Sequence, residues 1–172
     1  MSQDDLYAEA IAGFGAALER LARSYETDSE KRRDLLQEIH LAMWRSFEHF
    51  QGQCSLRTWV YQVAHNIGAT HVVRDRRSKA RTFVSIDDIA SLPEPGESGA
   101  ALDRRATLDR IYALIRLLKP LDREVILLYL EGLDAASIGE ITGLSPGNVA
   151  IKIHRIKSVL AGRLNEGGRD VK

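Results

Sequence analysis

Apolar residues recur at three- and four-residue spacing through two consecutive segments between residues 34 and 77, which is the spacing of one face of an α-helix. The first set is Leu35, Leu36, Ile39, Met43 and Phe47, and the second is Leu56, Trp59, Val63 and Ile67. The polar stretch 51–55 separates them and contains Gly52, which tolerates a turn, and Ser55, placed to cap the second helix. The pattern predicts two amphipathic helices joined by a polar loop.

The remaining sequence continues in helical periods, and no segment alternates polar and apolar residues as a half-buried strand does. We expect helices over 5–24, 29–50, 55–77, 102–118, 122–131, 135–142 and 146–164. Two prolines, two glycines and two serines fall within residues 91–99, a composition typical of a flexible linker. The prediction is an all-α chain of two small helical domains, 1–81 and 102–172, joined by a flexible linker at 82–101.

Charge is balanced over the 172 residues, with 24 basic and 24 acidic side chains, but it is not evenly spread. Residues 66–85 and 145–165 are cationic, whereas 86–103 contains only acidic charges. Two cationic segments predict two contacts on one polyanion. Three features predict a cytoplasmic protein. The chain has a single cysteine, no apolar run approaches the roughly 20 residues that span a bilayer, and the N-terminus lacks the basic-then-apolar order of a signal peptide.

Residues 133–164 have the pattern of a helix-turn-helix. Gly139 provides a small residue where the two helices cross, and Gly143 permits the tight turn. Ser145 and Pro146 suit the N-cap and the first position of the second helix. The apolar residues expected to pack between the two helices are Ile138, Ile141 and Leu144 from the first side and Val149, Ile153 and Ile156 from the second.

Five short motifs in residues 34–66 have the order and spacing of region 2 of the extracytoplasmic-function (ECF) sigma factors. These motifs are Asp34-Leu-Leu-Gln-Glu38, Trp44, Phe50-x-Gly52, Leu56-Arg-Thr-Trp-Val-Tyr61 and Ala64-His-Asn66. The helix-turn-helix resembles region 4 of the same family, which recognises the −35 promoter element. Together the two resemblances cover most of residues 6–165. They imply a promoter-recognition subunit of bacterial RNA polymerase with no catalytic chemistry and no cofactor of its own.

The resemblance also implies partners and contact residues. The partners are core RNA polymerase, through the clamp helices of its largest subunit and the flap of the second-largest, promoter DNA in duplex and single-stranded form, and an anti-sigma factor as a further hypothesis. Implied polymerase contacts are Asp34, Leu35, Gln37, Glu38, Trp44 and Arg45. Implied contacts to the −10 element, including a pocket for a flipped base, are Phe50, Gln51, Gln53, Cys54, Trp59, Gln62, Asn66, Arg74, Arg76 and Arg77. Implied contacts to the −35 element are Ser145, Asn148, Ala150, Ile151, Lys152, His154, Arg155 and Lys157.

Two departures from the family pattern stand out. The segment before Asp34 is basic, Lys31 to Arg33, where the family often has acidic residues. Ala150 and Ile151 stand where a basic residue and a serine are common, which implies an unusual −35 sequence.

Other interpretations remain open from the residues alone. Trp44 and Trp59 could be ordinary core aromatics. Cys54 with His49 and His65 lacks the paired spacing of a zinc site. A stand-alone helix-turn-helix regulator with a sensing or dimerising N-terminal bundle is the main alternative function. An enzyme is disfavoured because the sequence has no glycine-rich phosphate loop, paired catalytic carboxylates or metal-ligand cluster.

Overall fold

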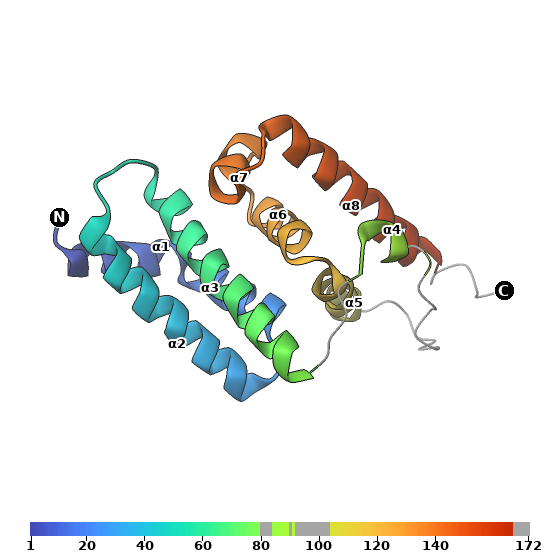
Figure 1. Ribbon diagram of the computed structural model, residues 1–172, viewed down its shortest axis with the longest axis horizontal. Helices are drawn as coiled ribbons and strands as arrows, with labels where there is room; N and C mark the ends of the chain where they lie inside the picture. Colours follow the sequence, from blue (N-terminus) through green and yellow to red (C-terminus); the bar gives the residue numbers. More distant parts are fainter. Residues whose placement is uncertain (80–83, 90, 92–103, 167–172) are drawn as a thin grey trace.

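The computed structural model describes residues 1–79, 84–89, 91 and 104–166, with the side chains of 76–79, 104–105 and 165–166 left out. Helices follow one another along the described chain, separated by short turns (Figure 1). They are α1 (Gln3–Tyr25), α2 (Ser29–Ser46), the 3-10 turn η1 (Phe47–His49), α3 (Leu56–Lys79), α4 (Ile86–Ile89), α5 (Arg104–Leu117), α6 (Pro120–Leu130), α7 (Ala135–Thr142) and α8 (Pro146–Glu166). The predicted all-α fold is confirmed, since no strand occurs within these ranges.

Polar caps fix where several helices begin. Ser2 accepts the backbone N–H of Asp5 at the start of α1, and Asp28 accepts the N–H groups of Glu30 and Lys31 at the start of α2. Ser55 accepts the N–H of Thr58, as the sequence predicted. Each cap satisfies a backbone donor that has no partner within its own helix.

The helices α1, α2 and α3 form the N-terminal bundle, in which α2 and α3 run antiparallel (Figure 1). Its interior contains Leu18, Leu35, Ile39, Met43 and Val60, all at most 1 % exposed. Gly68 lets α3 approach α1 closely, because a Cβ there would stand 2.6 Å from the ring of Tyr25. Most of the predicted apolar face of α2 is therefore buried in the core, and the predicted face of α3 packs partly buried against it.

The helices α5 to α8 form the C-terminal domain, which contains the expected helix-turn-helix in α7 and α8. Ile138, Val149 and Ile156 are at most 1 % exposed between the packed helices. Gly143 ends α7 with a φ of 77°, the left-handed conformation that glycine adopts without strain. A Cβ on Gly139 would stand 2.6 Å from the backbone oxygen of Leu144, so the close crossing requires a glycine.

The predicted linker contains one ordered element that the sequence reasoning missed. Residues 86–89 form the short helix α4, which packs against α8 and buries Ile86 and Ile89 (Figure 1). Val84 pairs with Leu118 through its backbone N–H to the oxygen of Leu117. Part of the predicted linker is therefore ordered, because burial of Ile86 and Ile89 against α8 anchors one helical turn. Two isoleucines are too few to show a helical period in the sequence. The Pro- and Gly-rich stretch 92–99 lies outside the described residues.

The two helical domains pack against each other through α1 and α3 on one side and α5, α6 and α7 on the other. Tyr61 of α3, 2 % exposed, is buried beside Val125, Leu128 and Leu133 of the C-terminal domain. Buried apolar packing thus continues across both halves.

Candidate nucleic-acid and polymerase interface

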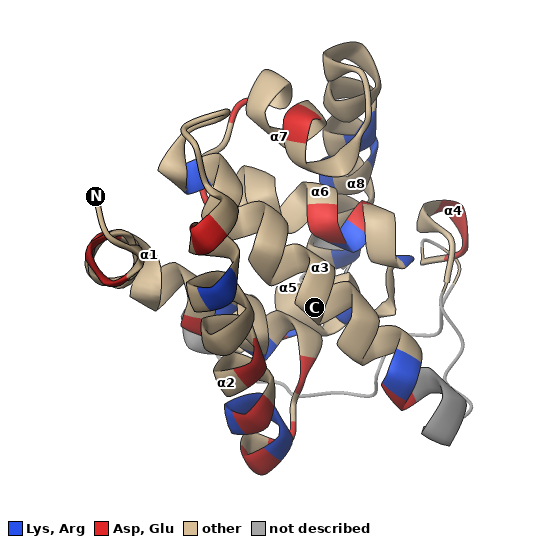
Figure 2. Cartoon of the chain, turned by 60° about the vertical axis from the view of Figure 1, so that its left-hand side comes forward, with Lys and Arg blue, Asp and Glu red and all other residues tan. Residues whose placement is uncertain are grey.

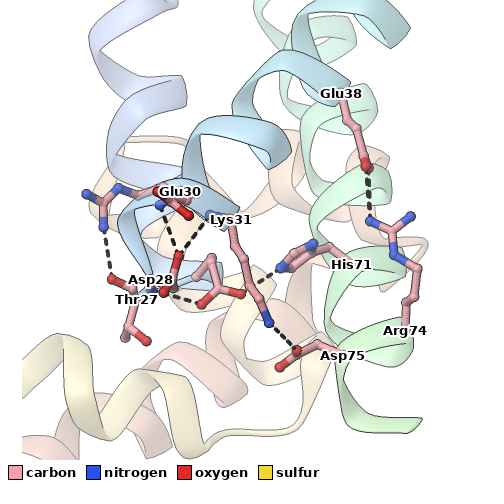
Figure 3. A network of polar contacts seen from close by, with 10 residues as sticks. Thr27, Asp28, Glu30, Lys31, Glu38, His71, Arg74 and Asp75 are labelled. Carbon is pink, nitrogen blue, oxygen red and sulfur yellow. Dashed lines mark hydrogen bonds and ion pairs between the residues drawn. The ribbon is translucent and has the colours of Figure 1, made fainter. Parts of the chain in front are cut away.

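The first candidate surface lies on α2 and the adjoining side of α3. Two ion pairs join the helices there: Lys31 Nζ lies 3.6 Å from Asp75 Oδ1, and Arg74 donates to both carboxylate oxygens of Glu38 at 3.1 and 3.2 Å (Figure 3). These pairs border a shallow pocket that Asp34 and Leu35 also line. The basic segment before Asp34 therefore contributes a cross-helix contact through Lys31.

A buried polar pair holds this surface in place from beneath. Glu26, 1 % exposed, accepts a hydrogen bond from His71 Nε2 at 3.0 Å and one from the backbone N–H of Asp28 at 3.0 Å. Burial alone raises the pKa of the Glu26 carboxyl, but these hydrogen bonds outweigh burial and lower it. The charged carboxylate therefore ties the end of α1 and the start of α2 to α3.

The predicted polymerase contacts divide into surface and core positions. Asp34, Gln37, Glu38 and Arg45 are exposed on α2. Leu35 is 1 % exposed within the bundle, so the prediction that it contacts polymerase is corrected: its side chain is a core residue. Its position in the apolar helical period already indicated this burial.

Trp44 is not a core aromatic, since 39 % of its surface is exposed. Its indole Nε1 donates to Asp4 Oδ1 at 2.9 Å, and Gln3 donates to its backbone oxygen at 2.7 Å. The first turn of α1 therefore fixes how this tryptophan is presented on the surface of α2.

The predicted base-capture loop, residues 50–54, is shaped by a layer of aromatic side chains. Phe50 packs against Trp59 with ring centroids 5.3 Å apart and against Phe47 at 6.3 Å. Trp59 is half-buried and donates from Nε1 to Ser46 Oγ at 2.9 Å. Phe50 and Trp59 thus support the loop from its inner side.

Hydrogen bonds within the loop set its curvature. The Gln53 side chain accepts the backbone N–H of Gln51 at 2.7 Å and donates to the backbone oxygen of His49 at 3.3 Å. Gly52 supplies a φ of 75° at the bend. Burial raises the pKa of the Cys54 thiol within the loop. Gln51 and Gln53 remain exposed.

Further −10 candidates follow along α3. Asn66 and Arg74 are exposed, and Gln62 is half-buried. Arg76 and Arg77 belong to α3, but their side chains lie outside the described residues. His65 precedes Asn66 on α3, is buried and shares a 2.9 Å hydrogen bond with the Tyr25 hydroxyl. Burial lowers the pKa of His65 to about 3, so its imidazole is neutral.

The second candidate surface is the outer face of α8. Asn148, Ala150, Ile151, His154, Arg155 and Lys157 are exposed, and Lys152 is half-buried. Ala150, Ile151, His154, Arg155 and Ser158 line one open hollow on this face. Ser145 is exposed at the start of the helix, where its hydroxyl accepts the N–H of Asn148 at 3.3 Å. All the predicted −35 residues therefore lie on α8 or at its N-cap.

Each lysine and arginine among the predicted −35 contacts on α8 has an intramolecular partner. Lys152 Nζ lies 2.6 Å from Asp122 Oδ1 in α6, and Lys157 lies 3.2 Å from the Tyr129 hydroxyl and above its ring. Arg155 contacts both carboxylate oxygens of Asp87 in α4. Figure 2 shows the acidic α4 and the basic stretches of α8. Asp87 of α4 thus forms an ion pair with Arg155, one of the cations of the helix-turn-helix.

Glu131 joins the two domains at the end of α6. Arg20 of α1 donates to its two carboxylate oxygens at 2.8 and 2.7 Å, and Arg57 of α3 donates to its backbone oxygen at 2.5 Å. The Tyr61 hydroxyl lies 3.5 Å from the same carboxylate. Beyond Glu131, the guanidinium of Arg123 lies 5.7 Å from the centre of the Tyr25 ring. These contacts join α1 and α3 of the N-terminal bundle to α6 of the C-terminal domain.

Neither a metal cluster nor a spanning helix was found in the described part of the chain. No three His, Cys, Asp or Glu side chains within those residues are grouped to hold a metal ion. No helix among them is long and apolar enough to cross a membrane.

The two halves match the two parts of one protein family. Residues 10–81 match sigma-70 region 2, and residues 108–160 match sigma-70 region 4. The chain belongs to the ECF group of sigma-70 RNA polymerase sigma factors. Region 2 thus corresponds to the surface on α2 and α3, and region 4 to the helix-turn-helix.

Individual proteins agree with this assignment. The chain is 25 % identical over 142 residues to the ECF RNA polymerase sigma-E factor of Haemophilus influenzae, covering 76 % of this chain and 73 % of that one. It is 26 % identical over 136 residues to the ECF sigma factor SigE of Mycolicibacterium smegmatis, covering 79 % of this chain and 52 % of that one. It is 35 % identical over 72 residues to the ECF sigma factor SigG of Mycobacterium tuberculosis, which is 42 % of this chain and 18 % of SigG.

Two solved structures share the fold. The sigma factor RpoE bound to the anti-sigma factor NepR from Bartonella quintana aligns with a TM-score of 0.68 at 18 % identity, covering 92 % of this chain and 96 % of that one. CnrH in complex with the cytosolic domain of CnrY aligns with a TM-score of 0.65 at 23 % identity, covering 93 % of this chain and 88 % of that one. At these identities the likeness concerns the fold alone.

Sequence reasoning did not find the intramolecular partners of several charged residues at these surfaces. Asp87, Asp122 and Glu131 carry no local motif, and each meets its cation only because the helices fold together. The acidic composition of 86–103 beside a cationic 145–165 was the one available signal, and it pointed to Asp87 without naming its partner.

Proposed function

We propose that this ECF sigma factor docks on core polymerase through the exposed residues of α2, captures an unpaired −10 base at the loop 51–54 and recognises the −35 element with α8. One observation supports this division best: most of the predicted contact residues on α2, in the loop and on α8 are exposed, while the apolar residues Ile39, Met43, Val149 and Ile156 of the same helices are buried. The protein supplies binding energy for strand opening, and the polymerase supplies catalysis. We place it in the bacterial cytoplasm.

The test of this function is promoter-directed transcription with purified core polymerase. Replacing Asp34 and Glu38 by alanine removes two exposed charges without touching the core, and should reduce initiation at least fivefold at limiting sigma factor. The expected fold-change follows from losing about 1 kcal/mol of docking free energy.

Glu9→Ala is the matched control, since Glu9 is an exposed acidic residue of α1 outside the proposed surface. It should leave initiation unchanged. Tight binding to duplex DNA together with no association with core polymerase would instead favour the stand-alone regulator.

Release of Arg155 from Asp87 should strengthen promoter binding. Asp87→Asn removes the carboxylate that competes with DNA phosphate for this guanidinium. Both partners are more than half exposed, so the expected gain is two- to fivefold and should shrink as salt is raised. The measurement is promoter-duplex binding by the reconstituted holoenzyme at two salt concentrations. Asp88→Asn removes the same charge one residue away, and an equal gain from it would exclude a specific effect of the Asp87–Arg155 pair.

An anti-sigma factor that covers the polymerase-binding surface is a second part of the proposal. It is supported by the two similar folds, each of which was solved with such a partner or with a cytosolic protein domain. Purification of the tagged protein from cells should recover a stoichiometric inhibitor. Recovery of polymerase alone would contradict this part and leave the sigma function intact.

A further inference from the structure

Ile151 is an unexplained apolar residue at the centre of the candidate DNA face. It is 66 % exposed, more than any other large apolar side chain of the described residues except Met1. The buried face of α8 is already complete without it, since Val149, Ile156 and Leu160 pack inward. Ile151 therefore contributes little to the fold, and together with Ala150 it forms the apolar part of an open hollow on the outer face of α8.

The surroundings of Ile151 identify the kind of partner. Ala150, His154, Arg155 and Ser158 line the same open hollow, which combines an apolar centre with a cationic edge. Ile151 lies in the second turn of α8, and the first turns of a recognition helix face base edges in the major groove. Within that groove the C5-methyl group of thymine is the apolar feature that a base presents. A protein partner would cover the apolar centre, but it would offer no DNA phosphate to the cationic edge.

We propose that Ala150 and Ile151 determine specificity at the −35 element by contacting the methyl group of thymine. This inference rests on the proposed function. The chemical class recognised is an A·T pair whose thymine methyl enters the hollow, while Arg155 contacts the neighbouring phosphate. Specificity at this position then comes from an apolar contact where a hydrogen-bonding side chain is common in the family.

The first experiment finds the base pair that Ile151 contacts. Holoenzyme containing the full chain selects duplexes from a library whose −35 region is randomised and whose −10 region is fixed. The wild-type protein should select thymine at a position where the Ile151→Ser variant no longer discriminates among bases, while Ile151→Val should keep the preference. Because Ile151 is exposed, neither substitution removes a core contact.

The second experiment removes only the methyl group. Replacing the selected thymine by uracil should weaken wild-type binding about fourfold, the value expected for one methyl group withdrawn from contact. The same replacement should leave binding by Ile151→Ser unchanged, and uracil at a thymine outside the −35 region is the DNA control. Equal binding of thymine and uracil duplexes by the wild-type protein, or an unchanged selected sequence for Ile151→Ser, overturns the inference and assigns the hollow to a protein partner. Failure to select any −35 sequence would instead overturn the proposed function and this inference with it.

Discussion

A single methyl group added at Gly139 is expected to destabilise the C-terminal domain by about 2 kcal/mol. The Cβ of Gly139→Ala would stand 2.6 Å from the backbone oxygen of Leu144, and a backbone oxygen cannot move away as a flexible side chain does. Alanine stabilises a helix by up to about 1 kcal/mol relative to glycine. The cost of forcing α7 away from α8 is larger than this gain. The variant should therefore also lose −35 recognition, because the turn that sets the direction of α8 is displaced.

Gly162→Ala provides a matched control in the same domain. Gly162 lies in α8, and a Cβ there meets nothing within 4 Å. The same chemical change should therefore stabilise the domain by about 0.5–1 kcal/mol. Urea unfolding followed by circular dichroism tests both variants, while the fluorescence of Trp44 and Trp59 reports only on the N-terminal bundle. If Gly139→Ala were as stable as Gly162→Ala, the close crossing of α7 and α8 would not be required.

The helices could be predicted because their signal is local. The expected helix 135–142 agrees with α7, and 146–164 falls two residues short of the end of α8. Gly139, Gly143 and Ser145 were assigned roles that the structure confirms, since each depends on the geometry of one turn or one crossing. The apolar helical period also indicated that Leu35 is buried, but the family motif led to its prediction as a polymerase contact.

The contacts between distant segments could not be predicted in the same way. Arg20 meets Glu131 across 111 residues, and Arg155 meets Asp87 across 68. Nothing in the local sequence selects one carboxylate among 24 acidic residues as the partner. These pairs depend on how the two domains pack, and the site residues assigned here stay predictions until binding is measured.

The packing of the two domains gives Glu124 an unusual environment. Burial raises the pKa of this α6 carboxyl to about 7. Its charge also contributes, after burial, to the raised pKa of Tyr25 at the end of α1, so the carboxyl lies near the contact between the domains. A carboxylate that has lost water without gaining a positive partner opposes this contact when it is charged.

The resulting pH dependence has a definite sign. Below about pH 4.5 the carboxyl is protonated in both the folded and the unfolded chain and imposes no penalty. As the pH rises from 4.5 towards 7, the Glu124 carboxyl ionises in the unfolded chain but stays protonated in the folded chain. The free energy of unfolding therefore falls. Above 7 the full penalty applies, up to about 3 kcal/mol for a carboxyl shifted this far.

Glu124→Gln should therefore raise the free energy of unfolding by up to about 3 kcal/mol at pH 8 and leave it nearly unchanged at pH 4.5. Chemical unfolding across this range measures the difference between the two proteins, and Glu140→Gln, at an exposed position of α7, is the charge-matched control. A gain that is equal at both pH values would show that the amide improves packing and that the charge of Glu124 has no effect.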